Sequence, residues 1–432
     1  RGLGDVYKRQ LFNLPDLPLI VGRSEVLGIN FEDLAFNADE FQHLLKEKYQ
    51  KNLTIDESRK LIAKTEGWVT GLHLAALSMR QQSEIDPKLL EPHVDAQYVM
   101  EYLFTEVFSK QPPEISQYLL GTAVLNRFCG PLCETVCAPG AEPFTCEIGG
   151  WEFIEWLKKE NIFIIPLDPE KRWYRYHHLF QKLLLNQLNR QYSTRDINVL
   201  HAQASDWFAE NGLIEEALQH ALAAGEVEKA GSLVARAGHQ LMNNEQWTRL
   251  ARCLYMLPRD HVERDAALIV LESWLHHVRQ NLSGMISCNK MIEALKTAIP
   301  PGTWVNVKHV QGHLEAQRGF LHYMDAEGES ALASSQRALR DIPLHHKRAR
   351  LFADIYLLGA YQMTGNLETG LSIYQKAMER YTERDEIYHA AYLGNIGLVY
   401  WMDANLIALQ QTAECLLDVV KEHWQPATVS YG

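Results

Sequence analysis

Residues 161–188 read NIFIIPLDPEKRWYRYHHLFQKLLLNQL, and this stretch decides the fold around it. Its apolar, β-prone opening runs into the turn-forming residues DPEK, and the β-prone residues WYRY follow. That order predicts a β-hairpin. Apolar residues at helical spacing then predict a helix over about 178–188. Because three more helices are expected upstream, the pattern predicts a winged-helix domain over 95–195.

Capping signals predict a small helical domain over 29–94. Asn37 with Glu40, and Thr54 with Glu57, have the spacing of capping boxes, which close the first turn of a helix. The helix that starts after Thr54 is expected to end at the glycine of the segment TEGW, at position 67.

The start of the chain predicts the end of another domain. An apolar run at 17–21 is bounded by Pro and Gly and is typical of a buried strand, so we assign 1–28 to a preceding domain. The first residue is Arg1, which is not an initiating Met. We therefore expect that the sequence begins inside a longer protein or carries non-native residues at its start.

The segment 196–432 contains only helical patterns, which form pairs with a weak internal repeat. Gly319, Gly359 and Gly397 recur at intervals of 40 and 38 residues. Small residues at fixed places allow paired helices to approach closely. The repeat predicts an incomplete superhelical sensor domain that resembles tetratricopeptide repeats and has a concave binding face. The expected fold class is therefore mostly α, with the β-hairpin as the exception.

The composition narrows the classes of function. The chain has 432 residues, a formal net charge of −12, 47% hydrophobic and 22% charged residues. An acidic balance gives no overall attraction to nucleic acid or to anionic membranes. No apolar run approaches the roughly 20 residues that span a bilayer, and no signal peptide is recognisable, so we expect no membrane partner. Seven cysteines are too few for a disulfide framework, which favours reduced thiols and a cytoplasmic location.

The motif search assigns no catalytic residue. The sequence has no G-x-x-x-x-G-K-[ST] phosphate loop, no G-x-S-x-G and no H-E-x-x-H. The chain is therefore not expected to hydrolyse a nucleotide by itself. Cys129, Cys133 and Cys137 are spaced along one predicted helix and do not converge well on one ion, so we interpret them as core residues. We expect no metal site within this chain.

Several segments in one order resemble the MalT-type large LuxR regulators. The segments are TEGWVTGLHLAAL at 65–77, EYL at 101–103, RYHHLF at 175–180, the EA and HAL elements at 216–222, and LP at 257–258. The resemblance runs in register over about 11–274. It implies a signal-transducing ATPase of the STAND class. In such proteins a nucleotide domain precedes a helical domain, a winged helix that clamps the nucleotide, a superhelical sensor and a LuxR-type helix-turn-helix.

The resemblance also implies ligands and site residues. ATP or ADP would be the cofactor of the full-length parent, a slow switch-type ATPase. Arg23 falls at the phosphate-sensing arginine, and His177 at the histidine that contacts the β-phosphate of ADP. Gly67 and Trp68 fall in a Gly-x-Pro motif that packs near adenine, with Val69 in place of the proline. From position alone, Arg23 and His177 would be interpreted as ordinary surface or half-buried side chains.

The implied partners lie mostly outside this chain. They are promoter DNA, bound through a missing C-terminal helix-turn-helix, and a small-molecule or protein inducer on the repeats, with self-oligomerisation on activation. Two alternatives stay open. One is a helical-repeat scaffold that binds neither nucleotide nor DNA. The other is a winged helix that binds DNA, although residues 95–190 hold nine Lys and Arg against twelve Asp and Glu.

Overall fold

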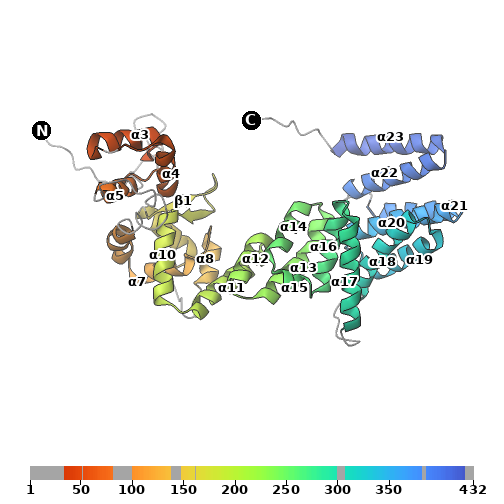
Figure 1. The fold of residues 1–432 in the computed structure, drawn as a ribbon, viewed down its shortest axis with the longest axis horizontal. Helices are drawn as coiled ribbons and strands as arrows, with labels where there is room; N and C mark the ends of the chain where they lie inside the picture. Colours follow the sequence, from red (N-terminus) through yellow and green to blue (C-terminus); the bar gives the residue numbers. More distant parts are fainter. Residues whose placement is uncertain are drawn as a thin grey trace. The chain divides into compact units, whose positions relative to one another are not determined.

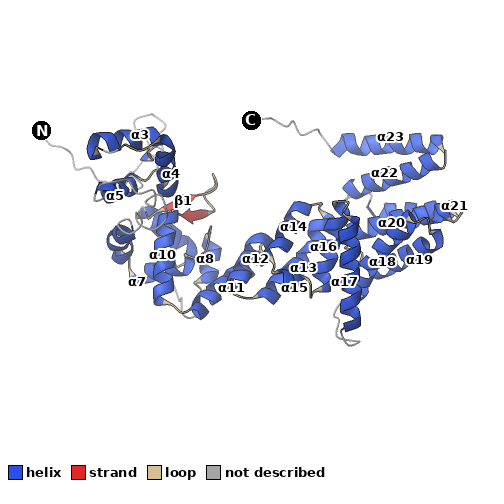
Figure 2. Ribbon diagram, in the orientation of Figure 1, coloured by secondary structure: helices blue, strands red, loops and turns tan. Residues whose placement is uncertain are grey.

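The computed structural model describes residues 34–50, 52–80, 100–137, 147–160, 162–298, 307–381 and 386–423. These residues are mostly helical, with one small two-stranded sheet among them (Figures 1 and 2), which confirms the predicted fold class. The chain divides into two compact units, residues 1–226 and 227–432. None of the described helices combines the length and apolarity needed to cross a bilayer.

The first unit opens with a helical module. It contains α3 (Ala38–Leu44), the continuing turn η2 (Leu45–Tyr49), α4 (Ile55–Thr65) and α5 (Val69–Arg80). Both predicted capping boxes are present. The Asn37 and Thr54 side chains accept hydrogen bonds from the backbone N–H groups of Glu40 and Glu57, and the glutamate side chains accept from the backbone N–H groups of Asn37 and Thr54. Phe41, Leu61 and Leu72 are fully or almost fully buried and form the core of the module.

The winged-helix part follows. Its elements are η4 (Leu103–Val107), η5 (Phe108–Lys110), α7 (Pro113–Thr122), α8 (Gly130–Val136), α9 (Gly150–Lys159), β1 (Ile164–Pro166), β2 (Tyr174–Tyr176) and α10 (His178–Gln191). The hairpin is confirmed with shorter strands than the sequence predicts. Its antiparallel register pairs Ile164 with Tyr176 and Pro166 with Tyr174.

Two local features hold the hairpin in place. The Asp168 carboxylate accepts from the backbone N–H groups of Arg172 and Trp173, at 2.8 and 3.0 Å, and so fixes the turn. Phe128 exchanges backbone hydrogen bonds with Tyr174 on the other edge of β2. The end of β2 is therefore fixed against the helices, and this determines where residues 175–178 lie.

The three cysteines of the winged-helix part lie in its core, as predicted. Cys133 and Cys137 are fully buried and Cys129 is 7% exposed. Burial raises the pKa of the Cys129 and Cys133 thiols, which makes them inert packing groups. Arg23 lies outside the described residues. The first unit ends with α11 (Thr194–Glu210) and α12 (Ile214–Ala223).

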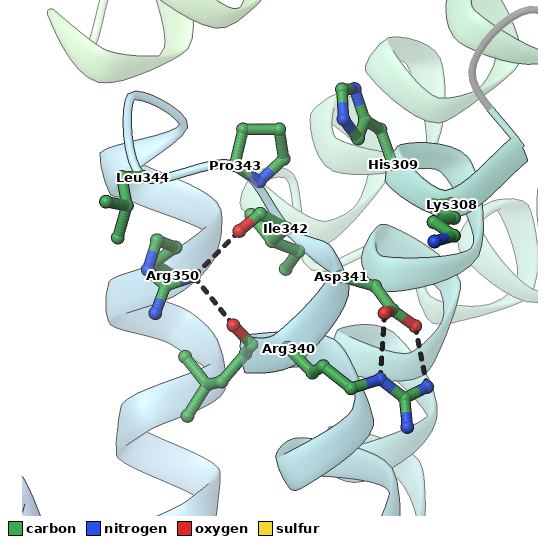
Figure 3. A pocket seen from close by; sticks show the side chains of 9 residues that line it. Lys308, His309, Arg340, Asp341, Ile342, Pro343, Leu344 and Arg350 are labelled. Atoms are coloured by element: carbon green, nitrogen blue, oxygen red, sulfur yellow. Dashed lines mark hydrogen bonds and ion pairs between the residues drawn. The ribbon is translucent and has the colours of Figure 1, made fainter.

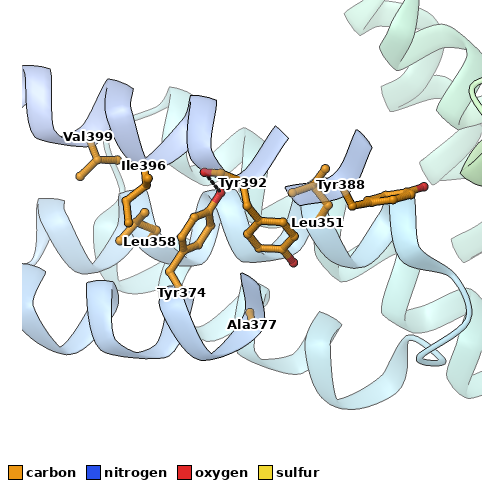
Figure 4. Packing of buried hydrophobic residues seen from close by; sticks show 8 residues of the cluster. All are labelled: Leu351, Leu358, Tyr374, Ala377, Tyr388, Tyr392, Ile396 and Val399. Atoms are coloured by element: carbon orange, nitrogen blue, oxygen red, sulfur yellow. Dashed lines mark hydrogen bonds between the residues drawn. The ribbon is translucent and has the colours of Figure 1, made fainter. Parts of the chain in front are cut away.

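The second unit is a series of helix pairs. Its helices are α13 (Val227–Asn243), α14 (Trp247–Met256), α15 (Arg259–Val262), α16 (Ala266–Val278), α17 (Leu282–Ala298), α18 (Val307–Met324), α19 (Gly328–Asp341), α20 (Lys347–Met363), α21 (Leu367–Met378) with η6 (Glu379–Tyr381), α22 (Glu386–Met402) and α23 (Leu406–His423). Figure 4 shows one of its cores, in which Leu358, Tyr374 and Tyr392 join α20, α21 and α22.

The repeated glycines have different surroundings. A Cβ on Gly319 would lie 2.6 Å from Ser335 Oγ, and one on Gly359 would lie 2.5 Å from the ring of Tyr323. Both glycines therefore allow close helix packing, as the repeat predicts. Gly397 has only ordinary contacts, the nearest at 3.6 Å. The turns that follow α20 and α22 use the left-handed residues Gly365 (φ 77°) and Ala404 (φ 58°).

Candidate functional site

Three of the four sequence-predicted site residues come together where the helical module meets the winged helix. Gly67 and Trp68 form the turn between α4 and α5, and His177 lies between β2 and α10. The fourth, Arg23, lies outside the described residues. The site therefore joins segments that are more than 100 residues apart in the chain.

The turn after α4 has a constrained backbone. Glu66 ends the helix in the left-handed region at φ 49°, and Gly67 follows at φ 73°. A Cβ on Gly67 would lie 2.8 Å from the carbonyl oxygen of Phe36 and 2.9 Å from the Cβ of Ala35. The Gly67 carbonyl also accepts from Phe36 N–H at 2.9 Å. Only glycine fits this position, for both its φ and its space.

Glu66 is the centre of the contact, and the sequence reasoning missed it. Its carboxylate accepts two hydrogen bonds from the Arg175 guanidinium, at 2.9 and 3.1 Å. Its Oε1 also lies 2.9 Å from His178 Nδ1. The bidentate arginine pair fixes direction as well as distance. Glu66 belongs to the motif TEGW and Arg175 belongs to the motif RYHHLF. Their places inside these two motifs are the sequence signal that could have selected them.

His177 is fully enclosed by this contact, with 1% of its surface exposed. Leu179 N–H lies 3.3 Å from His177 Nδ1, which therefore acts as an acceptor and caps α10. The ring proton accordingly resides on Nε2, which lies 3.0 Å from the Thr65 carbonyl oxygen and donates to it. Through these two hydrogen bonds, His177 connects the start of α10 with the end of α4.

The charges at the contact agree with these hydrogen bonds. Desolvation raises the pKa of Glu66, but the hydrogen bonds from Arg175 and His178 outweigh it and leave the pKa lowered. Burial lowers the pKa of His177, with the negative charge of Glu66 opposing that shift. At neutral pH the contact therefore contains an ionised Glu66 and an uncharged His177.

Trp68 packs in an aromatic cluster at the same place. Its ring centroid lies 5.0 Å from that of Phe163, 6.1 Å from that of Tyr102 and 6.2 Å from that of His177. The indole is only half-buried. We call the group of Glu66, Arg175, His177 and His178 the Glu66 contact, and Trp68 is the aromatic surface beside it.

The second unit contains a separate pocket of about 740 Å³ (Figure 3). Arg340 forms an ion pair with Asp341, and the buried Arg350 donates to the carbonyl oxygens of Leu339 and Ile342 at 2.8 and 2.7 Å. The lining is thus rich in cationic groups. It is formed by Lys308, His309, Leu339, Arg340, Asp341, Ile342, Pro343, Leu344 and Arg350.

Three tyrosines of the helical repeats, Tyr361, Tyr392 and Tyr400, have different positions. Tyr392 is fully buried, and its hydroxyl donates to Asp354 Oδ2 at 2.5 Å, so it is a core residue. Tyr400 packs against the same core and is partly buried. The Tyr361 hydroxyl accepts from Gln336 Nε2 at 3.4 Å. None of the three lines the pocket.

Comparisons with known proteins find relatives of the winged-helix part and of most of the chain. The family model of the MalT winged helix domain matches residues 104–196. The HTH-type transcriptional regulators MalT of Yersinia pestis and Yersinia enterocolitica are each 26% identical over 371 residues, which is 85% of this chain and 40% of each relative. The chain thus spans less than half of the length of these relatives.

A solved structure shares the fold. It is a STAND protein with a tetratricopeptide repeat sensor from Pyrococcus horikoshii, with a TM-score of 0.52 and 14% identity, covering 90% of this chain and 60% of the other. The RYHHLF segment, which supplies Arg175, His177 and His178 to the Glu66 contact, lies inside the matched range, whereas Glu66 itself lies outside it. Residues 104–196 thus match the MalT winged helix domain, within a chain that is similar to MalT-type transcriptional regulators along most of its length.

Proposed function

We propose that this chain is the nucleotide-clamping and inducer-sensing part of an ATP-dependent transcriptional activator. The observation that carries the proposal is the Glu66 contact. It joins a helical module to a winged helix through an ion pair and a buried histidine, at the motifs that resemble the MalT-type regulators. A contact of this kind can hold two domains closed in a resting state and release them on a signal.

Three features support the proposal of a nucleotide phosphate at His177, which would have to exchange its present contact with the Thr65 carbonyl for the phosphate. The ring carries its proton on Nε2, and that donor now reaches a neutral backbone carbonyl. A phosphate oxygen is a stronger acceptor because it is charged. Gly67 lets a backbone approach closely, and Trp68 offers a half-buried aromatic surface. When bound, the nucleotide would supply the negative charge that His177 and, in our proposal, Arg23 recognise.

The remaining parts of the proposal concern partners. Promoter DNA would be bound by a separate helix-turn-helix, and activation would involve self-association. The inducer would bind the repeats of the second unit. The pocket beside Arg350 is the site that we propose there, because it combines a volume suited to a small molecule with several charged and polar groups.

The test is His177→Ala in the complete regulator. Loss of one hydrogen bond to a charged group costs roughly 1.5–3 kcal/mol, or about a 10- to 150-fold change in equilibrium. We expect less ADP retained on the purified protein and higher basal transcription in a reporter assay.

The matched control is His178→Ala. His178 also reaches Glu66, but its side chain is 40% exposed and the resemblance gives it no phosphate contact. This variant should retain ADP. Unchanged ADP occupancy in His177→Ala, or equal losses in both variants, would limit His177 to a structural role.

A further inference from the structure

The second unit contains three histidines from three helices whose ring nitrogens lie close together. His239 is on α13, His313 is on α18, and His346 caps the start of α20. One nitrogen of each lies within 4.8 Å of the others. His313 and His346 are buried and His239 is partly exposed. We call these residues the histidine cluster.

The hydrogen bonds within the cluster leave one nitrogen unsatisfied. Trp274 Nε1–H donates to His313 Nδ1 at 3.0 Å, so the His313 proton is on Nε2 and is donated to His346 Nδ1 at 3.0 Å. His239 Nδ1 is buried and has no hydrogen-bond partner. A buried polar atom without a partner costs free energy and calls for an explanation, such as an ion.

The histidines are uncharged at neutral pH, as metal ligands must be. Burial, together with neighbouring histidines, lowers the pKa of His239 to about 4 and that of His346 to about 2. The same causes lower the pKa of His313. Three desolvated neutral imidazoles offer lone pairs and repel little, so the cluster can persist without an ion.

We propose that His239, His313 and His346 bind one divalent transition-metal ion, Zn²⁺ first among them. Imidazole nitrogen is a preferred ligand of zinc, and three protein ligands with one open position form a common zinc site. Such a site differs from Mg²⁺ and Ca²⁺ sites, which use oxygen ligands.

The ring separations suit this arrangement in two of the three pairs. Two imidazoles that bind one ion at about 2.1 Å, with tetrahedral angles, have centroids about 5 Å apart. The ring centroid of His313 lies 4.8 Å from that of His239, with 17° between the ring planes, and 5.2 Å from that of His346. The centroids of His239 and His346 are 3.6 Å apart. Both pairs that include His239 are stacked, so its ring must turn for its nitrogen to reach a shared ion.

Coordination also changes one proton position. In this arrangement His239 and His346 would each bind through Nδ1, whereas His313 would bind through Nε2 and move its proton to Nδ1. That nitrogen then faces the Trp274 N–H donor, which now lies 3.0 Å away. The indole must shift, and removing its N–H group should therefore favour the metal.

Sequence spacing alone predicted no metal site, because the cluster is assembled from distant segments. His309 and His313 do form an H-x-x-x-H pair on one face of α18, and His345 precedes His346. The ring centroids of His309 and His346 are 6.1 Å apart. His309 also lines the pocket of the second unit, so the histidine cluster lies near space that water can fill.

The first experiment measures metal directly on the whole 432-residue chain, prepared without a histidine tag and stripped with a chelator. We expect one Zn²⁺ per chain by elemental analysis after equimolar loading and gel filtration, and none for Mg²⁺ or Ca²⁺. Co²⁺ should give the visible absorption of a low-coordinate nitrogen site. Failure to retain zinc would overturn the proposal without any variant.

The variants assign the ligands. His239→Gln should weaken zinc binding about 100-fold by calorimetry, since ligands matter at least as much as their second-shell partners. His322→Gln is the control, because His322 is a surface histidine paired with Glu327. Trp274→Phe should bind zinc more tightly. Unchanged affinity in His239→Gln, or weaker binding in a folded Trp274→Phe chain, would overturn the assignment.

Discussion

The Glu66 contact and the histidine cluster use the same residue type in opposite surroundings. In the Glu66 contact, His177 and His178 lie beside a carboxylate and an arginine, and the buried ring is fixed by two backbone groups. In the histidine cluster, the rings stack on one another, and one nitrogen has no partner. In the Glu66 contact the histidines are therefore held by hydrogen bonds next to an ionised carboxylate, whereas the histidine cluster consists of neutral imidazoles with one unpartnered nitrogen.

The two regions also differ in what holds the side chains. The Glu66 contact depends on a tight turn with two successive left-handed residues, Glu66 and Gly67. The histidine cluster is presented by three long helices. Substitutions that alter the turn at Gly67 or the charge of Glu66 should therefore weaken the Glu66 contact. The stability of the second unit should not change, so it serves as the reference in the same molecule.

The largest effect is expected from Gly67→Ala. A methyl group there meets the Phe36 backbone and must also adopt φ 73°, so we expect a loss of roughly 3 kcal/mol in the first unit. Urea unfolding measures the loss, and hydrogen exchange should show faster exchange near residues 65–68.

Gly212→Ala is the matched control for that variant. Gly212 has the same φ of 73°, but an added Cβ would have nothing within 4 Å. Gly212→Ala should lower the free energy of unfolding by only about 1 kcal/mol, because the alanine must adopt the left-handed conformation but meets no neighbour. Equal losses in the two variants would mean that the close approach of Gly67 to Phe36 contributes nothing.

A smaller effect is expected from Glu66→Gln. The amide keeps the size of the side chain but removes the charge that Arg175 and His178 share, and we expect a loss of about 1–2 kcal/mol, since the contact is partly open to solvent. Glu106→Gln is the control, because it breaks an exposed pair with Lys110 within one helical turn. If the two substitutions cost the same, the Glu66 contact is no stronger than a surface pair.

The smallest effect is expected from pH. The pKa of His177 is lowered by burial, so the unfolded chain binds its proton more readily, and stability is lost as pH falls below the ordinary value of 6.5. The lowered pKa of Glu66 adds a second loss below its ordinary value of 4.5. Unfolding of the first unit between pH 7.5 and 5 measures the first step. His177→Gln should reduce the slope, and the remainder is expected from His201 and His220, because burial also lowers the pKa of both, that of His220 to about 4. An unchanged slope in that variant would assign the pH dependence to those other groups.

Much of the local structure follows from the sequence by itself. The structure confirms the two capping boxes and the turn at Asp168, in which the partners are a few residues apart. It also confirms the close helix packing at Gly319 and Gly359, which the repeat spacing predicts. Short-range interactions of this kind leave a readable pattern because the partners are neighbours in the chain.

The two functional assemblies were decided only by the tertiary structure. Glu66 and Arg175 are 109 residues apart, and His239 lies on a different helix from both of its neighbours in the cluster. The sequence resemblance selected His177, Gly67 and Trp68, but no spacing rule connects His177 to the Thr65 carbonyl or His239 to His313. Such contacts depend on how the helices pack against one another and against the end of the hairpin. The periodicity of the sequence shows which face of a helix is apolar, but it does not show which other element packs there or at what angle.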